Sequence, residues 1–195
     1  YNKLLKDANM TIANSQTTAT LLHTLYKIEV DGIVYPPVDT EIFRPYIVRK
    51  ENQVLLYLGS YAGDTDEKLV KGICEVLKKK GIEILVMGNK IIMDKLSEKF
   101  EVIPISGVSD IELAKIYSKS KLTICPQEWE QFGYVVAESI ACGTPVLAFN
   151  IMGPKEIIEQ TKLGLLAKNR REFLRMLEEY LDSRYSFPEK IYLSL

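Results

Sequence analysis

The chain has 195 residues, 47% of them hydrophobic and 26% charged, which is typical of a globular protein with one substantial core. Its 25 basic and 26 acidic side chains leave a net charge of −1, so nothing favours nucleic acid as a partner. No apolar run is as long as a transmembrane segment. Cys74, Cys125 and Cys142 lie in apolar segments without CxxC spacing, and we expect them to be unpaired core residues in a cytoplasmic protein.

The first 50 residues predict a short α/β unit followed by an interruption. Ser15 is a candidate N-cap. Strands are predicted over Met10–Ser15 and Glu29–Tyr35, and the helix that Ser15 caps is predicted between them, over Gln16–Tyr26. Two successive prolines prevent the second strand from continuing, so Val38–Lys50 is predicted to be an extended linker.

From residue 53 onward, strand and helix patterns alternate. The predicted strands are Val54–Leu58, Ile82–Met87, Glu101–Ile105, Lys121–Cys125, Pro145–Phe149 and Gly164–Ala167. The predicted helices are Asp64–Lys80, Ile91–Phe100, Asp110–Ser118, Tyr134–Cys142, Pro154–Gln160 and Arg170–Asp182. Because the strands are nearly continuous apolar runs, we predict an α/β fold, with a doubly wound, Rossmann-like parallel sheet that helices cover on both faces.

Two carboxylates, Glu130 and Glu138, stand out from this pattern. Glu130 lies in the loop after a predicted buried strand, and Glu138 lies within the next helix. The helical neighbours of Glu138 carry no positive charge: Tyr134, Val135, Ala141 and Cys142. An ionised carboxylate is costly in such surroundings unless hydrogen-bond donors satisfy it. Those donors belong either to another part of the chain, as in an ion pair, or to a ligand.

The position of this loop and helix favours a ligand. In open α/β sheets, ligands bind outside the carboxyl ends of the strands. The N-terminus of a helix offers free backbone N–H groups and a positive potential, which suit phosphate, whereas carboxylates accept hydrogen bonds from hydroxyl groups. A site that combines both suits a molecule with phosphates and many hydroxyls, such as a nucleotide sugar.

The stretch EQFGYVVAESIACGTPV, which begins at Glu130, resembles the E-x7-E signature of the group 1 glycosyltransferases, retaining enzymes of the GT-B class. The resemblance implies that Glu130 contacts the donor sugar and that Glu138 contacts the ribose. It also implies that the backbone amides of Phe132, Gly133 and Tyr134 receive sugar or phosphate oxygens. No bound metal or other cofactor is implied.

Two further segments are similar to the family. The loop from Gly153 to Glu156 resembles a Gly-Gly-x-x-Glu motif, with Met152 where the first glycine is usual. The resemblance implies that Gly153 and Glu156 lie at the donor, although an acid early in a helix also complements the helix dipole. The segment GVSDIELAKIY, which begins at Gly107, resembles the part beside the nucleobase, and its Tyr117 is expected to be a core residue.

Gly59 and Ser60 end the first strand of the alternating part. A glycine there allows the backbone to approach a pyrophosphate, and it also suits a simple turn. The family usually places an Arg directly after this glycine and a Lys a few residues later, both on the donor phosphates. Here Ser60 occupies the Arg position, and Lys68 best matches the Lys, with Lys71 as the alternative. Both lysines also suit the solvated face of a helix.

The resemblance implies the C-terminal, donor-binding half of a GT-B fold. We expect residues 1–38 to be the remnant of an acceptor-side domain, 39–52 a linker, 53–182 the nucleotide-sugar-binding domain and 183–195 a tail. The implied function is transfer of a hexose, with retention, from a UDP-, GDP- or ADP-sugar to a glycan or lipid-linked acceptor. This chain by itself is expected to be inactive, and the full-length protein to be cytoplasmic, with peripheral contact at the inner membrane face.

Two alternatives remain open. Ser60 and Met152 depart from the family pattern and favour a non-catalytic or degenerate nucleotide-sugar-binding module. A nucleotide-sugar epimerase of the GT-B class is the other alternative, and the spacing of Glu130 and Glu138 argues against it.

Overall fold

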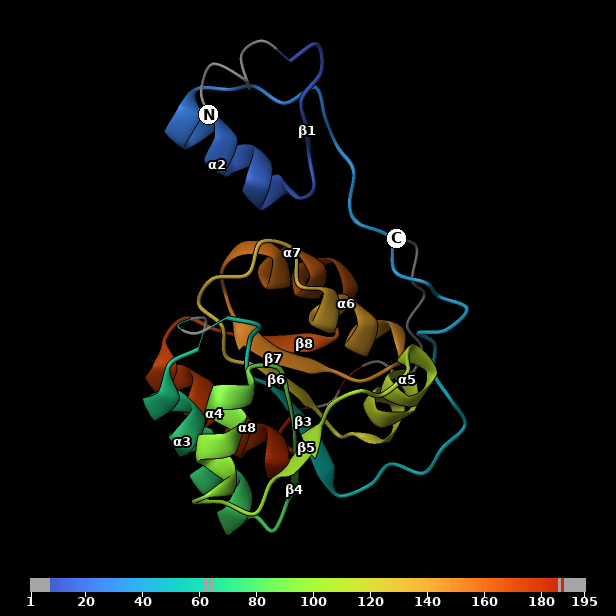
Figure 1. Ribbon diagram of the computed structural model, residues 1–195, viewed down its shortest axis with the longest axis vertical. Helices are drawn as coiled ribbons and strands as arrows, with labels where there is room; N and C mark the ends of the chain where they lie inside the picture. The colour runs from blue at the N-terminus through green and yellow to red at the C-terminus, as the bar shows by residue number, and fades with distance from the viewer. Residues whose placement is uncertain (1–7, 62, 64, 186, 188–195) are drawn as a thin grey trace.

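A computed structural model describes residues 8–61, 63, 65–185 and 187. A sheet of six parallel strands in the order β5-β4-β3-β6-β7-β8 forms its centre (Figure 1). The strands are β3 (Gln53–Tyr57), β4 (Glu83–Met87), β5 (Ile103–Ile105), β6 (Thr123–Cys125), β7 (Val146–Phe149) and β8 (Gly164–Ala167). The helices between and after them are α3 (Glu67–Lys79), α4 (Lys90–Ser97), α5 (Asp110–Lys119), α6 (Tyr134–Ala141), α7 (Met152–Thr161) and α8 (Arg170–Leu181). The predicted Rossmann-like fold is confirmed.

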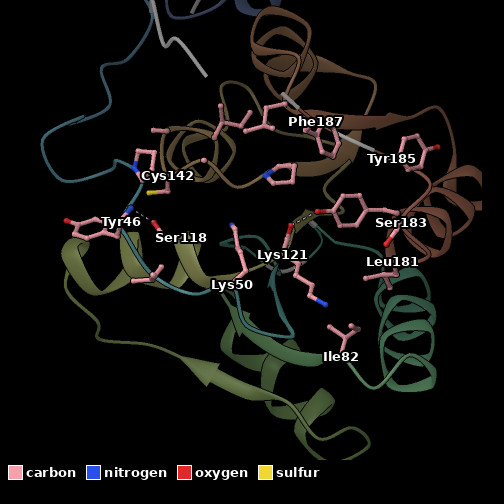
Figure 2. A pocket seen from close by; sticks show the side chains of 18 residues that line it. Tyr46, Lys50, Ile82, Ser118, Lys121, Cys142, Leu181, Ser183, Tyr185 and Phe187 are labelled. Atoms are coloured by element: carbon pink, nitrogen blue, oxygen red, sulfur yellow. Dashed lines mark hydrogen bonds between the residues drawn. The ribbon is translucent and has the colours of Figure 1, made fainter. Parts of the chain in front are cut away.

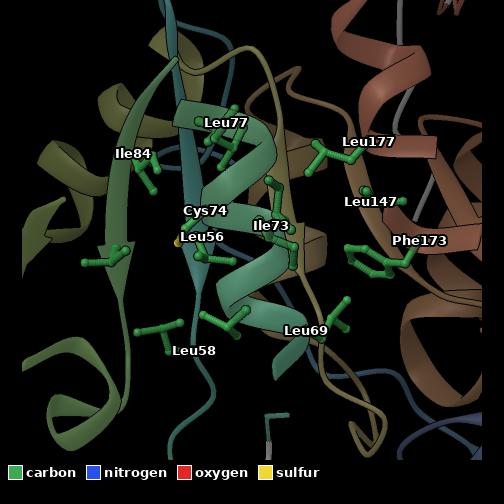
Figure 3. Packing of buried hydrophobic residues seen from close by; sticks show 14 of the residues in the cluster. Leu56, Leu58, Leu69, Ile73, Cys74, Leu77, Ile84, Leu147, Phe173 and Leu177 are labelled. Carbon is green, nitrogen blue, oxygen red and sulfur yellow. The ribbon is translucent and has the colours of Figure 1, made fainter. Parts of the chain in front are cut away.

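Helices cover both faces of this sheet. On one face, α3, α4 and α8 pack in a buried cluster in which Ile73 and Phe173 meet the sheet residues Leu56 and Leu147 (Figure 3). On the other face, α5, α6 and α7 bury a second set of apolar side chains against the sheet. Each fully buried aliphatic or aromatic side chain stabilises the fold by about 1.5–3 kcal/mol relative to an exposed one. In the part of the chain that the structure describes, no helix is both long and apolar enough to cross a bilayer.

The order of the strands determines where a ligand fits. The chain proceeds outward from β3 through β4 to β5, then returns to place β6 on the other side of β3. In the β3–β6 pair, Leu55 lies opposite Thr123 and Leu56 lies opposite Ile124. The direction of winding reverses at this pair, and ligands of doubly wound sheets bind outside the carboxyl ends of the strands at such a point. The loops that follow β3 and β6 therefore define the candidate site.

A small α/β unit precedes the sheet and lies beside α7 (Figure 1). It consists of β1 (Ile12–Ala13), α2 (Gln16–Tyr26) and β2 (Gly32–Ile33). The side chain of Ser15 caps α2 as predicted. The strand predicted over Glu29–Tyr35 is restricted to two residues, because its parallel partner β1 offers only two residues for pairing.

The prediction of an extended linker over residues 38–50 is wrong in its first part. The amide of Phe43 donates to the carbonyl of Asp39 at 2.8 Å and closes a turn. The ring of Phe43 is buried, 6.3 Å from the ring of Tyr117 on α5. A large apolar side chain gains free energy by leaving water, so this segment packs on the domain instead of spanning space.

The predicted start of the helix at Asp64 is also too early. Helix α3 begins at Glu67, because the side chain of Asp66 is the N-cap and accepts the amides of Lys68 and Leu69 at 2.7 and 2.9 Å. Such a cap contributes about 1 kcal/mol and fixes the first turn.

Candidate functional site

The loops that follow β3 and β6 are joined beneath the candidate site. The side-chain amide of Gln127 donates to the carbonyl of Tyr57 at 2.7 Å and to the hydroxyl of Thr65 at 3.1 Å. The Thr65 hydroxyl donates to the carbonyl of Leu58 at 2.9 Å. Gln127 and Thr65 are buried, so these bonds are shielded from water and hold the two loops in a defined relation.

Gly59 and Ser60 lie where the sequence places them, at the carboxyl end of β3. Gly59 has a φ of 73°, in the left-handed region that favours glycine. Its carbonyl oxygen lies only 2.4 Å from the position that a Cβ atom on Gly88 would take, so the ends of β3 and β4 touch through backbone. Ser60 is exposed, and its hydroxyl lies 2.9 Å from the hydroxyl of Tyr57.

The two lysines proposed for the donor phosphates differ in their surroundings. Lys68 is exposed in the first turn of α3, and its side chain makes no ion pair with any residue that the structure describes. Lys71 lies one turn later and pairs with Glu75 at 3.7 Å. Lys68 is thus the better placed of the two for a ligand, and its contact with the donor phosphates stays a prediction.

Arg170 is a cation at this edge that the sequence reasoning missed. It is the first residue of α8, and its guanidinium contacts Asp66 at 2.5 Å and Glu128 at 3.1 Å. Through these contacts it links the start of α3 to the loop after β6. The two acids are far apart in sequence, and nothing in either segment indicates that they share one arginine.

Glu130, Phe132, Gly133 and Gly153 form one cluster. The amide of Gly153 donates to the carbonyl of Glu130 at 3.1 Å, and a Cβ atom on Gly153 would lie 2.1 Å from the carbonyl oxygen of Phe132. Gly133 has a φ of 96° and begins α6 without a side-chain cap, so the first amides of α6 are not satisfied by a capping group. Tyr134 follows and is half exposed. The structure thus brings together the residues that the motif predicts for the sugar.

Met152 and Asn150 are unusual residues beside this cluster. Met152 has a φ of 55°, a left-handed conformation that costs a non-glycine residue about 1–2 kcal/mol. Met152 thus has the backbone conformation that favours glycine, and it stands at the position where the Gly-Gly-x-x-Glu motif has its first glycine. The side-chain oxygen of Asn150 is buried without a hydrogen-bond partner among the described residues. Such an unsatisfied acceptor is costly, and no sequence signal singled it out.

Glu138 lies one helical turn beyond this cluster, on the face of α6 that contacts α5. Its carboxylate accepts the hydroxyl of Tyr117 at 3.0 Å and makes no ion pair with the described part of the chain. Desolvation raises the pKa of Glu138 to about 7, the Tyr117 hydrogen bond opposes that rise, and the charge of Asp110 adds to it. The prediction that Tyr117 belongs to the core is confirmed, but its hydroxyl also gives Glu138 a neutral partner that helix periodicity could not reveal.

Glu156 binds the N-terminal unit. Its carboxylate accepts the amides of Gln16 and Thr17 at 3.0 and 2.6 Å, the hydroxyl of Thr17 at 2.6 Å and the hydroxyl of Tyr35 at 3.3 Å. Glu156 therefore occupies the positive N-terminus of α2, where a carboxylate is stabilised by the helix dipole. Its contact with a donor remains a prediction, and the structure adds a second role, which is to hold α2 against α7.

The second role can be tested by replacing Glu156 with Gln. We expect the amides of Gln16 and Thr17 to exchange with deuterium several-fold faster, because the charged acceptor for both is lost. Hydrogen–deuterium exchange followed by mass spectrometry measures this, with Glu159→Gln on the exposed part of α7 as the matched control. Unchanged exchange at α2 together with a loss of nucleotide-sugar affinity would instead assign Glu156 to the donor.

The chain matches a family model described as glycosyl transferases group 1 over residues 38–192. It is 24% identical over 193 residues to the D-inositol 3-phosphate glycosyltransferase of Mycobacteroides abscessus, which covers 87% of this chain and 43% of that protein. The chain thus spans less than half the length of this relative.

Two solved structures share the fold. Sucrose-phosphate synthase from Thermosynechococcus elongatus superposes with a TM-score of 0.76 and 19% identity over 93% of this chain and 51% of its own. The Anabaena protein Alr3699/HepE, solved in complex with UDP and glucose, superposes with a TM-score of 0.74 and 16% identity over 94% of this chain and 56% of its own. The sheet matches the Rossmann-like domains of the GT-B glycosyltransferases. Together with the family match, these findings show that the chain belongs to the group 1 glycosyltransferases.

Proposed function

We propose that the protein transfers a hexose from a nucleoside diphosphate sugar to an acceptor with retention, and that this chain supplies the donor-binding half. One observation carries the proposal: the carboxylate of Glu138, desolvated on α6, has a neutral tyrosine hydroxyl as its partner and no cation among the described residues. The hydroxyl groups of a ribose would complete its hydrogen bonding without a positive charge.

The other predicted residues are arranged along the same edge of the sheet. In the proposed complex, the diphosphate lies over Gly59 and the uncapped first turn of α6, with Lys68 as an available cation. Glu130 and the amides of Phe132 and Gly133 orient the sugar. The protein supplies positioning and electrostatic stabilisation of the departing diphosphate rather than a nucleophile. No metal ion or other cofactor enters this proposal.

We further propose the following division of the chain. Residues 53–182 bind the nucleotide sugar, 39–52 connect them to 1–38, which belong to the acceptor side, and 183–195 form a tail. The glycan or lipid-linked acceptor is bound mainly by parts of the protein outside this chain, in keeping with the 43% of its relative that the chain spans. The enzyme works in the cytoplasm, with peripheral contact at the inner membrane face.

Isothermal titration calorimetry of the chain with UDP-, GDP- and ADP-glucose tests donor binding directly. We expect weak binding of one of these compounds and no sugar transfer by the chain alone, because the proposal assigns most of the acceptor side to parts of the protein outside this chain. The absence of heat with all three, in protein whose circular dichroism shows a folded α/β domain, would contradict the proposal.

Replacing Ser60 with Arg distinguishes the transferase from a degenerate binding module. If Ser60 lies at the donor diphosphate, a guanidinium there forms charge-assisted hydrogen bonds worth about 1.5–3 kcal/mol, and we expect nucleotide-sugar affinity to rise roughly tenfold or more. Calorimetry measures this, with Ser97→Arg at the far end of α4 as a control that adds the same charge. Equal affinities for the wild type and Ser60→Arg would favour the non-catalytic module.

A further inference from the structure

A cavity lies at the opposite end of the strands from the candidate donor site. It has a volume of about 620 Å³, within the range of small-molecule sites (Figure 2). Lys50, Ile82, Lys121, Pro145 and Leu163 line it, and each stands directly before or close before a strand of the sheet. The cavity is therefore at the amino ends of the strands, whereas the motif residues are at the carboxyl ends.

Aromatic rings form much of its wall. Figure 2 shows Tyr46 at one side of the space and Tyr185 and Phe187 at the other, and Tyr180 also lines the cavity. The hydroxyl of Tyr180 already donates to the carbonyl of Lys121 at 2.6 Å, and the hydroxyl of Tyr185 donates to Glu179 at 3.0 Å. These two residues consequently offer a ligand their rings rather than their hydroxyl groups. Flat apolar surfaces of this kind favour an aromatic or similarly flat body.

The charged groups of the wall have one sign. Two lysines line the cavity, and no aspartate or glutamate is among the described residues that line it. The Lys121 ammonium donates to the side-chain oxygen of Asn52 at 2.6 Å. Glu51, the carboxylate next to Lys50 in the chain, is paired with Lys119 at 2.9 Å. The electrostatic field in the cavity therefore favours an anion.

Lys50 is the polar centre of this cavity. Its side chain is accessible from the cavity mouth. Its ammonium group donates to the carbonyl of Ser120 at 2.6 Å and to the hydroxyl of Thr144 at 2.7 Å, and both of these residues are fully buried. Both acceptors are neutral. An ammonium has three N–H donors, so one remains after these two bonds. Desolvation lowers the pKa of Lys50 to about 8, and the interaction with Cys142 opposes this only in part.

We propose that this cavity binds a small molecule that joins one acidic group, a carboxylate or a phosphate, to a flat apolar body. The acidic group pairs with the ammonium of Lys50, and the body lies against the aromatic side chains that line the cavity. The acidic group accepts the remaining N–H of Lys50 and adds a counter-ion beside the two neutral acceptors, so the partly desolvated charge is compensated. This site is separate from the donor site and does not depend on its assignment.

Phenyl phosphate is the probe for this proposal, titrated by calorimetry into the full chain at pH 7. We expect phenyl phosphate to bind at least tenfold more tightly than inorganic phosphate, which lacks the flat apolar body, or benzyl alcohol, which lacks the acidic group. Lys50→Gln should lower its affinity at least tenfold, whereas Lys90→Gln, an exposed lysine at the start of α4, should leave it unchanged. In spectra of ¹⁵N-labelled lysine side chains, bound phenyl phosphate should raise the pKa of Lys50.

A second variant tests the proposal independently, in case Lys50→Gln does not fold. Val48 lies on the cavity wall, and Val48→Phe should fill the space and abolish phenyl phosphate binding while the ammonium of Lys50 remains in place. Circular dichroism establishes that each variant is folded. Equal binding of phenyl phosphate and inorganic phosphate, unchanged binding in both Lys50→Gln and Val48→Phe, or no binding by the wild type would overturn the proposal.

Discussion

Replacing Glu138 with Gln is expected to weaken nucleotide-sugar binding at least tenfold and, at pH 8, to make the domain more stable. Gln keeps the shape of the side chain and an oxygen that can accept the hydroxyl of Tyr117, now 3.0 Å from the carboxylate. It removes the charge that would accept ribose hydroxyls, and charge-assisted hydrogen bonds contribute about 1.5–3 kcal/mol each. It also removes the cost of a desolvated carboxylate.

The pH dependence of this effect follows from the raised pKa of Glu138. The pKa is about 7 in the folded state against an ordinary value of 4.5 for a solvated glutamate, so the folded state binds more protons between these values. The stabilisation that comes from protonated Glu138 is fully present below pH 4.5 and is lost as the pH rises through 7. Gln lacks this titration. The two proteins should be similarly stable near pH 5, and the variant should gain on the order of 1–3 kcal/mol at pH 8.

Thermal denaturation at pH 5 and pH 8 measures stability, and calorimetry with UDP-, GDP- and ADP-glucose measures affinity. The wild type should also bind its donor less tightly at pH 6 than at pH 8, since a protonated carboxyl is a poorer acceptor. Glu159→Gln is the matched control for both readouts. A variant that is less stable at both pH values and binds the donor normally would show that Glu138 has a structural role only.

Replacing Gly153 with Ala is expected to destabilise the domain by about 3 kcal/mol or more. The added Cβ atom would lie 2.1 Å from the carbonyl oxygen of Phe132 and 2.5 Å from its carbonyl carbon. Both are backbone atoms, so a side-chain rotation cannot relieve the contact, and overpacking of this kind costs about 1–3 kcal/mol or more. The loop that carries Glu130 must shift, because the amide of Gly153 donates to its carbonyl.

Urea denaturation measures this loss, and calorimetry should show that any folded Gly153→Ala protein binds nucleotide sugars more weakly than the wild type. Gly32→Ala is the control: a Cβ atom there meets nothing within 4 Å, and its φ lies outside the left-handed region. If Gly153→Ala were as stable as Gly32→Ala, the close approach of α7 to the backbone of Phe132 would not exist in solution.

Much of the fold could be predicted from local patterns. The alternation of apolar runs and amphipathic helices identified each strand of the main sheet, and Ser15 marked the start of α2 correctly. The boundary errors arose where a side chain or a partner decides the end of an element. Asp66 caps α3 two residues after the predicted start of the helix, and β2 is short because β1 is short.

The candidate site could be predicted only in part, for a related reason. The spacing of Glu130 and Glu138, with glycine between them, places both near the carboxyl edge of a sheet, because loop and helix positions follow from the local pattern. The hydrogen bond from the Tyr117 hydroxyl to Glu138 joins residues that are 21 positions apart in the sequence. The hydrogen bond from the first turn of α2 to Glu156 joins residues that are 139 positions apart. Sequence spacing carries no information about such contacts.

The amino-acid sequence by itself thus determined the α/β architecture and the placement of the motif at one end of the strands, because both depend on periodicity and turn chemistry that act over a few residues. The tertiary structure alone decided which groups donate hydrogen bonds to the carboxylates of Glu138 and Glu156, and that Lys50 lines a cavity. Those properties depend on helix packing against a common sheet, which brings together side chains that no local pattern relates, and on the desolvation that this packing imposes.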